Sequence, residues 1–466
     1  MKYKFASIVL VLALLLGGVF TSKVEAGAYD TQFTTSITYQ NVGTGPATIN
    51  LMFYAENSAT GIPISLPELA PLAGTSIYVG SIGDIANGFK GSAVMSSNQP
   101  LVSTLVQVPK AGSGVAVRPM SNGFTSGSDY VLVPTVLKGM FGSNSIVSVQ
   151  NIDTVTADFE LIFVPVAGTS ILVTTENVPS GATKYYDLGI MSEIPAGFNG
   201  SLQVFATKDE TTEGANVVAS ALELSITGTG AYAFEGASDF ATTIYMPSAL
   251  CKFNGVQTSS YAVQNTTAGN VDVTVEYAGG GTAGPVTLAA GAKQSFNACD
   301  VNASGYIGSA VITATGDIVA MGKVFGGGLS TAFLGFNNGV AQVALPYVRW
   351  TTAHWFDGTR QRAYIAIQNV GASLDAGEVT VKYYDKTGAL VGTDTLGAIA
   401  AGAKANSNAG NIGAAAAEFG YYTDGTFGGS AIVEGPTGAQ LAVIVRVQSR
   451  VGADSVAEDY SGIAIQ

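Results

Sequence analysis

Residues 264–277 read QNTTAGNVDVTVEY, and this stretch carries the pattern that decides the fold. Apolar and polar residues alternate strictly from Val271 to Tyr277. Because successive side chains of a strand point to opposite faces, this alternation is typical of a strand with one buried and one exposed face. Gly and Asn clusters separate the other apolar runs at turn-like intervals, and helical spacing is hard to find. The sequence therefore predicts an all-β protein built from antiparallel sheets.

The Gln-Asn pair that opens this stretch occurs four times, at intervals of 110, 114 and 104 residues: Gln40-Asn41, Gln150-Asn151, Gln264-Asn265 and Gln368-Asn369. Each pair is followed by an alternating run and then by an aromatic-x-Gly-Ser signature, which stands at Phe89–Ser92, Phe198–Ser201, Tyr306–Ser309 and Phe427–Ser430. The period is the size of a small domain and far longer than a solenoid repeat. We therefore expect four β-sandwich modules, at residues 27–112, 113–228, 229–329 and 330–466.

Within a module, the signature is expected to be structural, with its aromatic ring plugging the end of the core and its glycine adopting an unusual backbone angle. Ser97–Pro100 is expected to be a hairpin turn. A leader strand with a proline precedes modules two to four, and proline in a sheet indicates an edge or a bulge. The leaders contain Pro134, Pro247 and Pro346. Module one is expected to lack this strand, unless residues 31–35 replace it.

The first 26 residues are typical of a secretory signal peptide. Lys2 and Lys4 precede an apolar run from Ile8 to Leu16, and a cleavage site is expected after Ala26. The apolar run is too short for a comfortable membrane span, and no later stretch is apolar enough to cross a bilayer. We therefore expect a secreted protein, extracellular or at the cell surface.

The charge balance excludes several partners. The formal net charge is −13, which argues against nucleic acid and against an anionic membrane surface. Charged residues make up 11% of the chain, so the surface is cheap to desolvate and favours packing against copies of itself. No cofactor is predicted. Calcium binding stays open, although the sequence has no EF-hand-type loop.

At the level of motifs, the chain resembles the tandem immunoglobulin-like β-sandwich repeats of secreted and cell-surface proteins from filamentous, Chloroflexi-type bacteria. The shared features are the leader with its proline, Q-N-x-G, the alternating strand, G-F-x-G-S-A-V and Q-P-L. Module one matches best, with Gln40–Gly43, Gly88–Val94 and Gln99–Leu101. The resemblance implies an immunoglobulin-like sandwich and an extracellular location. It implies no activity and no site residues.

Residues that carry chemistry are few. His354 is the only histidine, and none of the common hydrolase, zinc-protease or nucleotide-binding motifs is present, so we expect no enzyme and no metal site. Cys251 and Cys299 are expected to form a disulfide inside module three.

Two segments are candidates for binding or assembly. Residues 349–362 hold both tryptophans, and aromatic and Arg side chains are typical of binding sites, so a glycan or cell-surface ligand could bind at Trp350, His354, Trp355, Arg360 and Arg362. A hairpin that covers the end of the sandwich is the alternative interpretation. The tail residues Ile463, Ala464 and Ile465 could add as a strand to another subunit, or fold back on module four. The leading hypothesis is a self-assembling surface-layer, sheath or filament subunit; the alternative is a secreted adhesin.

Overall fold

The structure, a computed structural model, describes residues 33–110, 112–113, 115, 117–209, 211–351, 360–416, 418–422, 426–451 and 454–465. The expected signal peptide lies outside these residues. The described chain forms 31 strands and three short 3₁₀ helices, η1 (Val79–Ser81), η2 (Ala298–Asp300) and η3 (Ala409–Ala416). The prediction of an all-β fold with antiparallel sheets is confirmed.

The same strand order recurs in four consecutive units, each made of an inner and an outer layer, called here the inner and outer sheets. The two layers are separate in units 1 and 4, whereas the pairing of β8 with β9 joins them in unit 2 and the long β21 joins them in unit 3. The inner sheets pair, in order, β4 (Gly74–Tyr78), β1 (Phe33–Asn41), β6 (Leu101–Pro109) and β7 (Met120–Asn122) in unit 1; β12 (Thr183–Asp187), β9 (Ser143–Asn151), β14 (Val217–Ser225) and β15 (Ala231–Glu235) in unit 2; β20 (Lys293–Asn297), β17 (Thr258–Asn265), β21 (Tyr306–Gly326) and β22 (Leu329–Leu334) in unit 3; and β27 (Lys404–Ser407), β24 (Arg360–Asn369), β29 (Leu441–Val451) and β30 (Asp454–Ser461) in unit 4.

The outer sheets repeat a second order. They pair β3 (Gly61–Ser65), β2 (Ile49–Ala55) and β5 (Gly91–Ser97) in unit 1; β11 (Ile171–Val178), β10 (Ala157–Pro165), β13 (Phe198–Lys208) and β8 (Tyr130–Met140) in unit 2; β19 (Thr282–Leu288), β18 (Val271–Tyr277), the long β21 again and β16 (Ala241–Cys251) in unit 3; and β26 (Leu390–Thr395), β25 (Thr380–Tyr384), β28 (Ser430–Glu434), β23 (Gln342–Leu345) and β31 (Ile463–Ala464) in unit 4.

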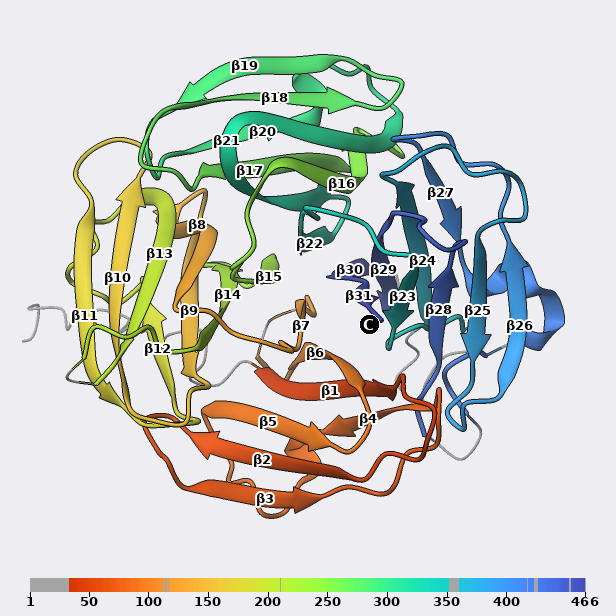
Figure 1. Ribbon diagram of the computed structural model, residues 1–466, viewed down its shortest axis with the longest axis horizontal. Coiled ribbons are helices and arrows are strands. Elements are labelled where there is room, and N and C mark those ends of the chain that lie inside the picture. The colour runs from red at the N-terminus through yellow and green to blue at the C-terminus, as the bar shows by residue number, and fades with distance from the viewer. Residues whose placement is uncertain are drawn as a thin grey trace, which may run out of the picture.

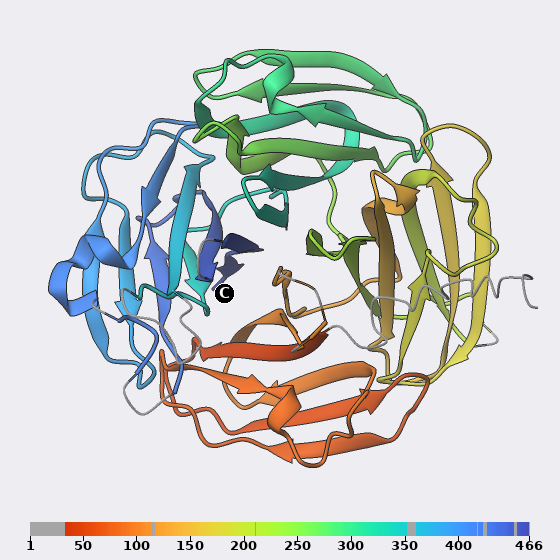
Figure 2. The same ribbon diagram turned by 180° about the vertical axis from the view of Figure 1, so that it is seen from behind.

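The four units stand in a ring in chain order (Figure 1). The last strands of the inner sheets, β7, β15, β22 and β30, point towards the centre, and the view from behind shows the same arrangement (Figure 2). Consecutive members of this set contact each other, and β30 contacts β7, so the contacts run round the whole ring. The last unit is therefore packed against the first.

Alternation along the strands builds the core of each unit. In β18, Val271, Val273 and Val275 are buried, whereas Asp272 and Glu276 are exposed. The apolar faces of the two sheets meet in one main cluster for each unit, and the clusters of units 2, 3 and 4 also take in buried residues of a neighbouring unit. The cluster of unit 1 is smaller, and several of its apolar residues are only partly buried, among them Ala93, Met95, Leu101 and Leu105.

Three local expectations differ from the structure. Residues 98–100 are not a hairpin turn, because β5 pairs with β2 and β6 pairs with β1, so the chain crosses there from one sheet to the other. The expected module ends at 112, 228 and 329 fall before or at the start of β7, β15 and β22, which pair with the preceding unit. Residues 33–35 do not replace a leader, because they belong to β1 and pair with β6.

The prolines of the leaders lie where the ladder is interrupted. Pro134 in β8 and Pro247 in β16 fall within register shifts opposite β13 and β21. Pro346 comes directly after β23. Proline cannot donate a hydrogen bond to a ladder, so the bulge accommodates it without an orphaned partner.

Candidate functional site

The asparagine of each Gln-Asn pair is fully buried and joins three backbone groups. Asn151 donates from Nδ2 to the carbonyl oxygens of Val155 (2.8 Å) and Val178 (2.9 Å), and its Oδ1 accepts from the amide of Asp153 (2.9 Å). Asn41, Asn265 and Asn369 make the same three kinds of contact in their units. The repeated asparagine therefore fixes the turn after the first inner strand to the opposite turn of its own unit.

The serine of the signature connects one unit to the next. Ser92 Oγ donates to the carbonyl oxygen of Gly181 (3.0 Å), Ser201 Oγ to that of Gly291 (3.2 Å), and Ser309 Oγ to that of Gly402 (2.9 Å). The Gln side chains of the receiving units, Gln150, Gln264 and Gln368, donate from Nε2 to the same three carbonyl oxygens. Two of the recurrent markers thus meet at every joint between consecutive units.

The joint between unit 4 and unit 1 is built differently. Ser430 Oγ is buried and has no hydrogen-bond partner. The turn residue with positive φ is a glycine in units 2 to 4 (Gly181, Gly291 and Gly402), but in unit 1 it is Leu72, with φ 62°. Arg349 lies at this joint, fully buried, and donates from Nη1 to the carbonyl oxygens of Val348, Gly428 and Gly429. Its Nη2 lies 3.5 Å from Ser76 Oγ of unit 1.

The aromatic residue of the signature packs edge-on against a core ring in three units: Phe89 against Phe53, Phe198 against Phe163 and Tyr306 against Tyr277. In unit 4 the core ring Tyr383 packs edge-on against Phe419, whereas the signature residue Phe427 contacts Tyr421. The prediction that the aromatic ring of the fourth signature fills the end of the core is therefore wrong.

The glycine of the fourth signature, Gly429, has the expected unusual angle, with φ 112°, whereas the glycines of the first three signatures are needed for space. A Cβ on Gly91 would lie 1.9 Å from the carbonyl oxygen of Tyr54, and one on Gly200 would lie 2.3 Å from that of Val164. The positive φ belongs instead to the glycine before the aromatic residue, at Gly88, Gly197 and Gly305.

The predicted binding segment is only partly described. His354 and Trp355 lie outside the described residues. Trp350 is partly buried against the core of unit 4, the Arg362 guanidinium carbon lies 4.8 Å from the centre of its ring, and Tyr364 contacts the ring edge-on at 5.8 Å. Arg360 begins β24. One face of the indole is therefore covered by the chain's own guanidinium.

The other predicted residues have structural positions. Cys251 and Cys299 form a disulfide between the end of β16 and η2. Ile463 and Ala464 form β31, which pairs with β23 of the same chain, and the amide of Ile465 donates to the carbonyl oxygen of Gln342 at 3.1 Å. The tail is thus folded back on unit 4, as the second of the two interpretations expects.

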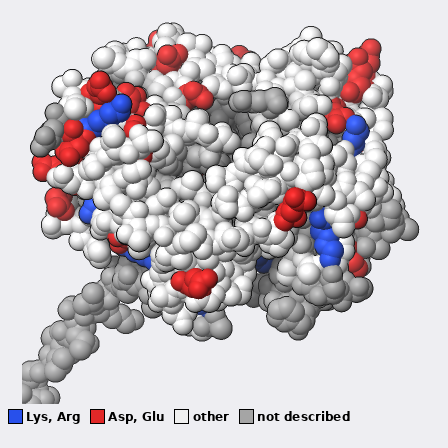
Figure 3. All heavy atoms as spheres, turned by 60° about the horizontal axis from the view of Figure 1, so that its bottom comes forward, with Lys and Arg blue, Asp and Glu red and all other residues white. Residues whose placement is uncertain are grey.

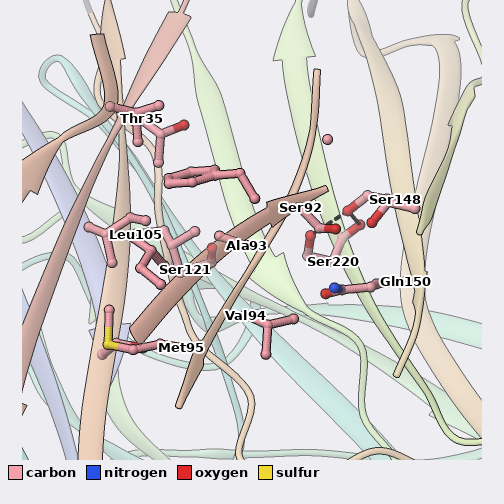
Figure 4. Close-up of a pocket in the computed structure, with 18 of the residues that line it drawn as sticks. Thr35, Ser92, Ala93, Val94, Met95, Leu105, Ser121, Ser148, Gln150 and Ser220 are labelled. Carbon is pink, nitrogen blue, oxygen red and sulfur yellow. Dashed lines mark hydrogen bonds between the residues drawn. The ribbon is translucent and has the colours of Figure 1, made fainter. Parts of the chain in front are cut away.

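A groove on unit 1 was not anticipated as a site. It has a volume of about 840 Å³ and lies between the two sheets of unit 1 and the inner sheet of unit 2. Figure 4 shows Ala93, Val94 and Met95 of β5 on one wall, with Ser148 and Ser220 of unit 2 across from them. The sequence feature that could have indicated this groove is the expected absence of a leader strand from module one.

Buried charges gather near the centre of the ring. Lys323 Nζ lies 2.5 Å from Glu223 Oε2 and 4.7 Å from the centre of the Tyr232 ring. Arg446 makes a two-point contact with Asp459, which also accepts from Thr331 Oγ1. Within the described residues, no three His, Cys, Asp or Glu side chains are grouped to hold a metal ion.

Comparison with known proteins adds little. No family model matches the chain, and no curated protein matches it. One solved structure, described as the tetra-tandem repeat in the extending region of a large adhesion protein, covers 95% of this chain and 98% of its own length at 12% identity, with a TM-score of 0.09. That score carries no argument about the fold. In the described part of the chain, no helix has the length and apolarity to cross a membrane.

Proposed function

We propose that this protein is a non-enzymatic structural subunit of the cell exterior, secreted through a cleaved signal peptide, which assembles with copies of itself into a surface layer, sheath or filament. Its four units are assigned in this proposal to the immunoglobulin-like β-sandwiches of the Chloroflexi-type surface proteins. The observation that carries the proposal is that the repeated residues make structural hydrogen bonds: the buried Asn, the Gln and the signature Ser all hold turns or units together.

The character of the surface supports this proposal. Figure 3 shows one face on which Lys, Arg, Asp and Glu are scattered among large uncharged areas. Such areas can be desolvated at low cost when copies pack together, because few charges lose their hydration. The chain has one histidine and lacks the common catalytic motifs, which favours a structural role over an enzymatic one.

Electron microscopy of residues 27–466 at rising concentration, with and without calcium, tests the proposal. We expect regular sheets, tubes or filaments above a threshold concentration. Persistent single rings at all concentrations, with either calcium condition, would contradict self-assembly. A broad screen for hydrolase activity is the control for the enzymatic alternative, and we expect no turnover.

A secreted adhesin that binds a glycan through the Trp-rich segment is the second candidate. Its support is the presence of both tryptophans within residues 350–355. The packing of Trp350 against Arg362 and Tyr364 leaves Trp355 as the better test position. Loss of glycan-array or cell binding in Trp355→Ala, with unchanged thermal unfolding, would favour adhesion over assembly.

A further inference from the structure

Within the described residues, which begin at Phe33, unit 1 shows no counterpart of a strand that the other three units possess. In units 2, 3 and 4, the outer strand that begins within the signature (β13, β21 and β28) pairs on its second edge with a leader: β8, β16 and β23. In unit 1, the corresponding strand β5 pairs with β2 alone among the described strands, which leaves its other edge open there. An open edge presents unpaired backbone donors and acceptors to any extended chain that reaches it.

The open edge can be assigned residue by residue. The carbonyl oxygen of Lys90 accepts from the amide of Glu56 next to β2, so Lys90 faces β2. Backbone groups alternate sides along a strand, and therefore Gly91, Ala93 and Met95 direct theirs to the open edge. In unit 2 the corresponding edge is occupied: Leu202 and Val204 lie opposite Val133 and Val131 of β8. Two residues further on, Ala206 donates to the carbonyl oxygen of Asp129, immediately before β8, at 2.9 Å.

The absence of the strand leaves apolar surface uncovered. Leu202 and Val204 of β13, which pairs with β8, are fully buried in unit 2, whereas their counterparts Ala93 and Met95 are only partly buried. Leu101 and Leu105 on the facing sheet also remain partly exposed to the groove. The groove is therefore the space that a leader strand fills in each of the other units.

The groove is continuous with an interface that the molecule already uses. Leaders lie at the joints: β8 contacts β17 and β21 of unit 3, and Thr135 of β8 accepts a hydrogen bond from Lys293 Nζ at 2.7 Å. At the joint of units 1 and 2, the same position is lined by Ser148, Gln150 and Ser220 of unit 2. An occupant would thus contact both units, as the leaders do elsewhere.

The described part of the chain has no strand left over to fill the groove. Each strand in the described residues already has a partner strand, the tail included. Counting 110 residues back from β8, the interval between the first two Gln-Asn pairs, gives residues 20–30, FTSKVEAGAYD. The core-facing Val131 and Val133 of β8 correspond there to Thr21 and Lys23. A lysine at a core position is unfavourable.

We propose that this groove is a strand-acceptor site for a separate polypeptide: an extended segment with apolar residues at alternate positions, which adds antiparallel to β5 along Gly91–Met95 and covers Leu101 and Leu105. The backbone provides the affinity and the alternate apolar side chains provide the selectivity, as in other cases of strand addition. The inference goes beyond self-assembly, because it assigns a partner of defined chemistry to one place on the ring.

The test uses residues 27–466 and a fluorescent synthetic peptide with the sequence of Tyr130–Met140, the leader of unit 2. We expect saturable one-to-one binding by fluorescence anisotropy, and slower hydrogen exchange at the amides of Ala93 and Met95. A peptide of the same composition in scrambled order should bind at least tenfold more weakly. Failure of the leader peptide to bind, or equal binding of the scrambled peptide, would overturn the proposal.

Three variants locate the binding. Met95→Pro removes an amide that faces the open edge and spares the bonds to β2, and Ala93→Lys places a charge in the groove; each should weaken peptide binding at least tenfold. Leu172→Lys is the matched control, because Leu172 is 56% exposed on the outer edge strand β11, away from the groove. Circular dichroism checks that all three fold. Unchanged binding in both groove variants would overturn the assignment.

Two further hydrogen-exchange measurements distinguish a separate polypeptide from other chains that could fill the groove. Slower exchange of the β5 amides at rising protein concentration, without peptide, would show that a second copy fills the groove and would overturn the claim of a separate partner. Slower exchange in the full chain but not in residues 27–466 would show that the N-terminal segment fills it, with the same consequence. Electron microscopy of Met95→Pro tests self-assembly separately from peptide binding. If this variant forms polymers but does not bind the peptide, the proposed function is unaffected.

Discussion

Ser201 Oγ donates a hydrogen bond of 3.2 Å to the carbonyl oxygen of Gly291, and this contact is one of those that tie unit 2 to unit 3. The same relationship recurs at the next joint, between Ser309 and Gly402, and at the preceding one, between Ser92 and Gly181. Ser430 occupies the corresponding place at the closing joint, but its buried hydroxyl has no partner. The serine of the repeated signature therefore joins consecutive units at three joints, and the corresponding hydrogen bond is not made where the ring closes.

Replacement of these serines should have unequal effects. Ser201→Ala is expected to lower the free energy of unfolding by about 1 kcal/mol, because a buried carbonyl oxygen loses a donor. Ser430→Ala removes a hydroxyl that makes no hydrogen bond and should have an effect near zero. Urea unfolding of both variants measures the difference. Equal losses would contradict the role assigned to the joint.

The buried asparagines should be far more sensitive than exposed ones. Asn151→Ala leaves the carbonyl oxygens of Val155 and Val178 and the amide of Asp153 without their partner. We expect a loss of about 2–4 kcal/mol, measured by thermal or denaturant unfolding. Asn216→Ala, at an exposed position, is the control and should change the stability by less than about 0.5 kcal/mol.

The disulfide should stabilise unit 3. Cys251 and Cys299 are 48 residues apart and close a loop around β17 to β20. Replacement of both by serine is expected to lower the free energy of unfolding by about 2–4 kcal/mol, because the unfolded chain gains conformational freedom. The measurement compares the variant with the oxidised parent. A reduced parent that unfolds like the oxidised one would contradict the expectation.

Two buried groups should make stability depend on pH, with slopes of opposite sign below and above pH 7. Burial raises the pKa of the Glu458 carboxyl to about 7, above its ordinary value of 4.5. The folded state therefore binds more protons than the unfolded state between pH 4.5 and 7, and stability falls as pH rises through this range. Burial lowers the pKa of Lys293 to about 7, so between pH 7 and 10.5 the unfolded state binds more protons and stability rises with pH.

Matched neutral variants separate these two contributions. Glu458→Gln should weaken the decline below pH 7, and Lys293→Met should weaken the rise above it, each on the order of 1–3 kcal/mol. Part of the rise should remain in Lys293→Met, because burial also lowers the pKa of Lys404 to about 7. Unfolding at a series of pH values measures both slopes. A slope that persists unchanged in its own variant would show that another group causes it.

Much of the strand content could be read from the sequence. Alternation such as that of Val271, Val273 and Val275 reports local geometry, since a strand exposes alternate residues to opposite faces whatever lies beyond. The recurrence of Gln-Asn and of the signature likewise predicted four similar segments. The crossing at residues 98–100 was mistaken for a hairpin, because a turn between adjacent strands and a passage between two sheets use the same residue types.

The positions of single residues depended on partners that are distant in sequence. Arg349 was grouped with a binding loop, yet it is buried at the closing joint, where it donates to the carbonyl oxygens of Gly428 and Gly429. Nothing in the local sequence distinguishes an arginine that binds a ligand from one that satisfies backbone carbonyls some 80 residues away. The same holds for Phe419, which takes the core position expected for Phe427.

The sequence by itself determined the all-β fold and the fourfold repetition, because both are written in local periodicity and in the spacing of identical residues. The tertiary structure alone decided that the repeats form a ring, that the signature serine joins neighbouring units, and that the edge of β5 is open beside a groove. These features are contacts between segments about a hundred residues apart. Their geometry depends on how whole sheets pack, which no local pattern encodes.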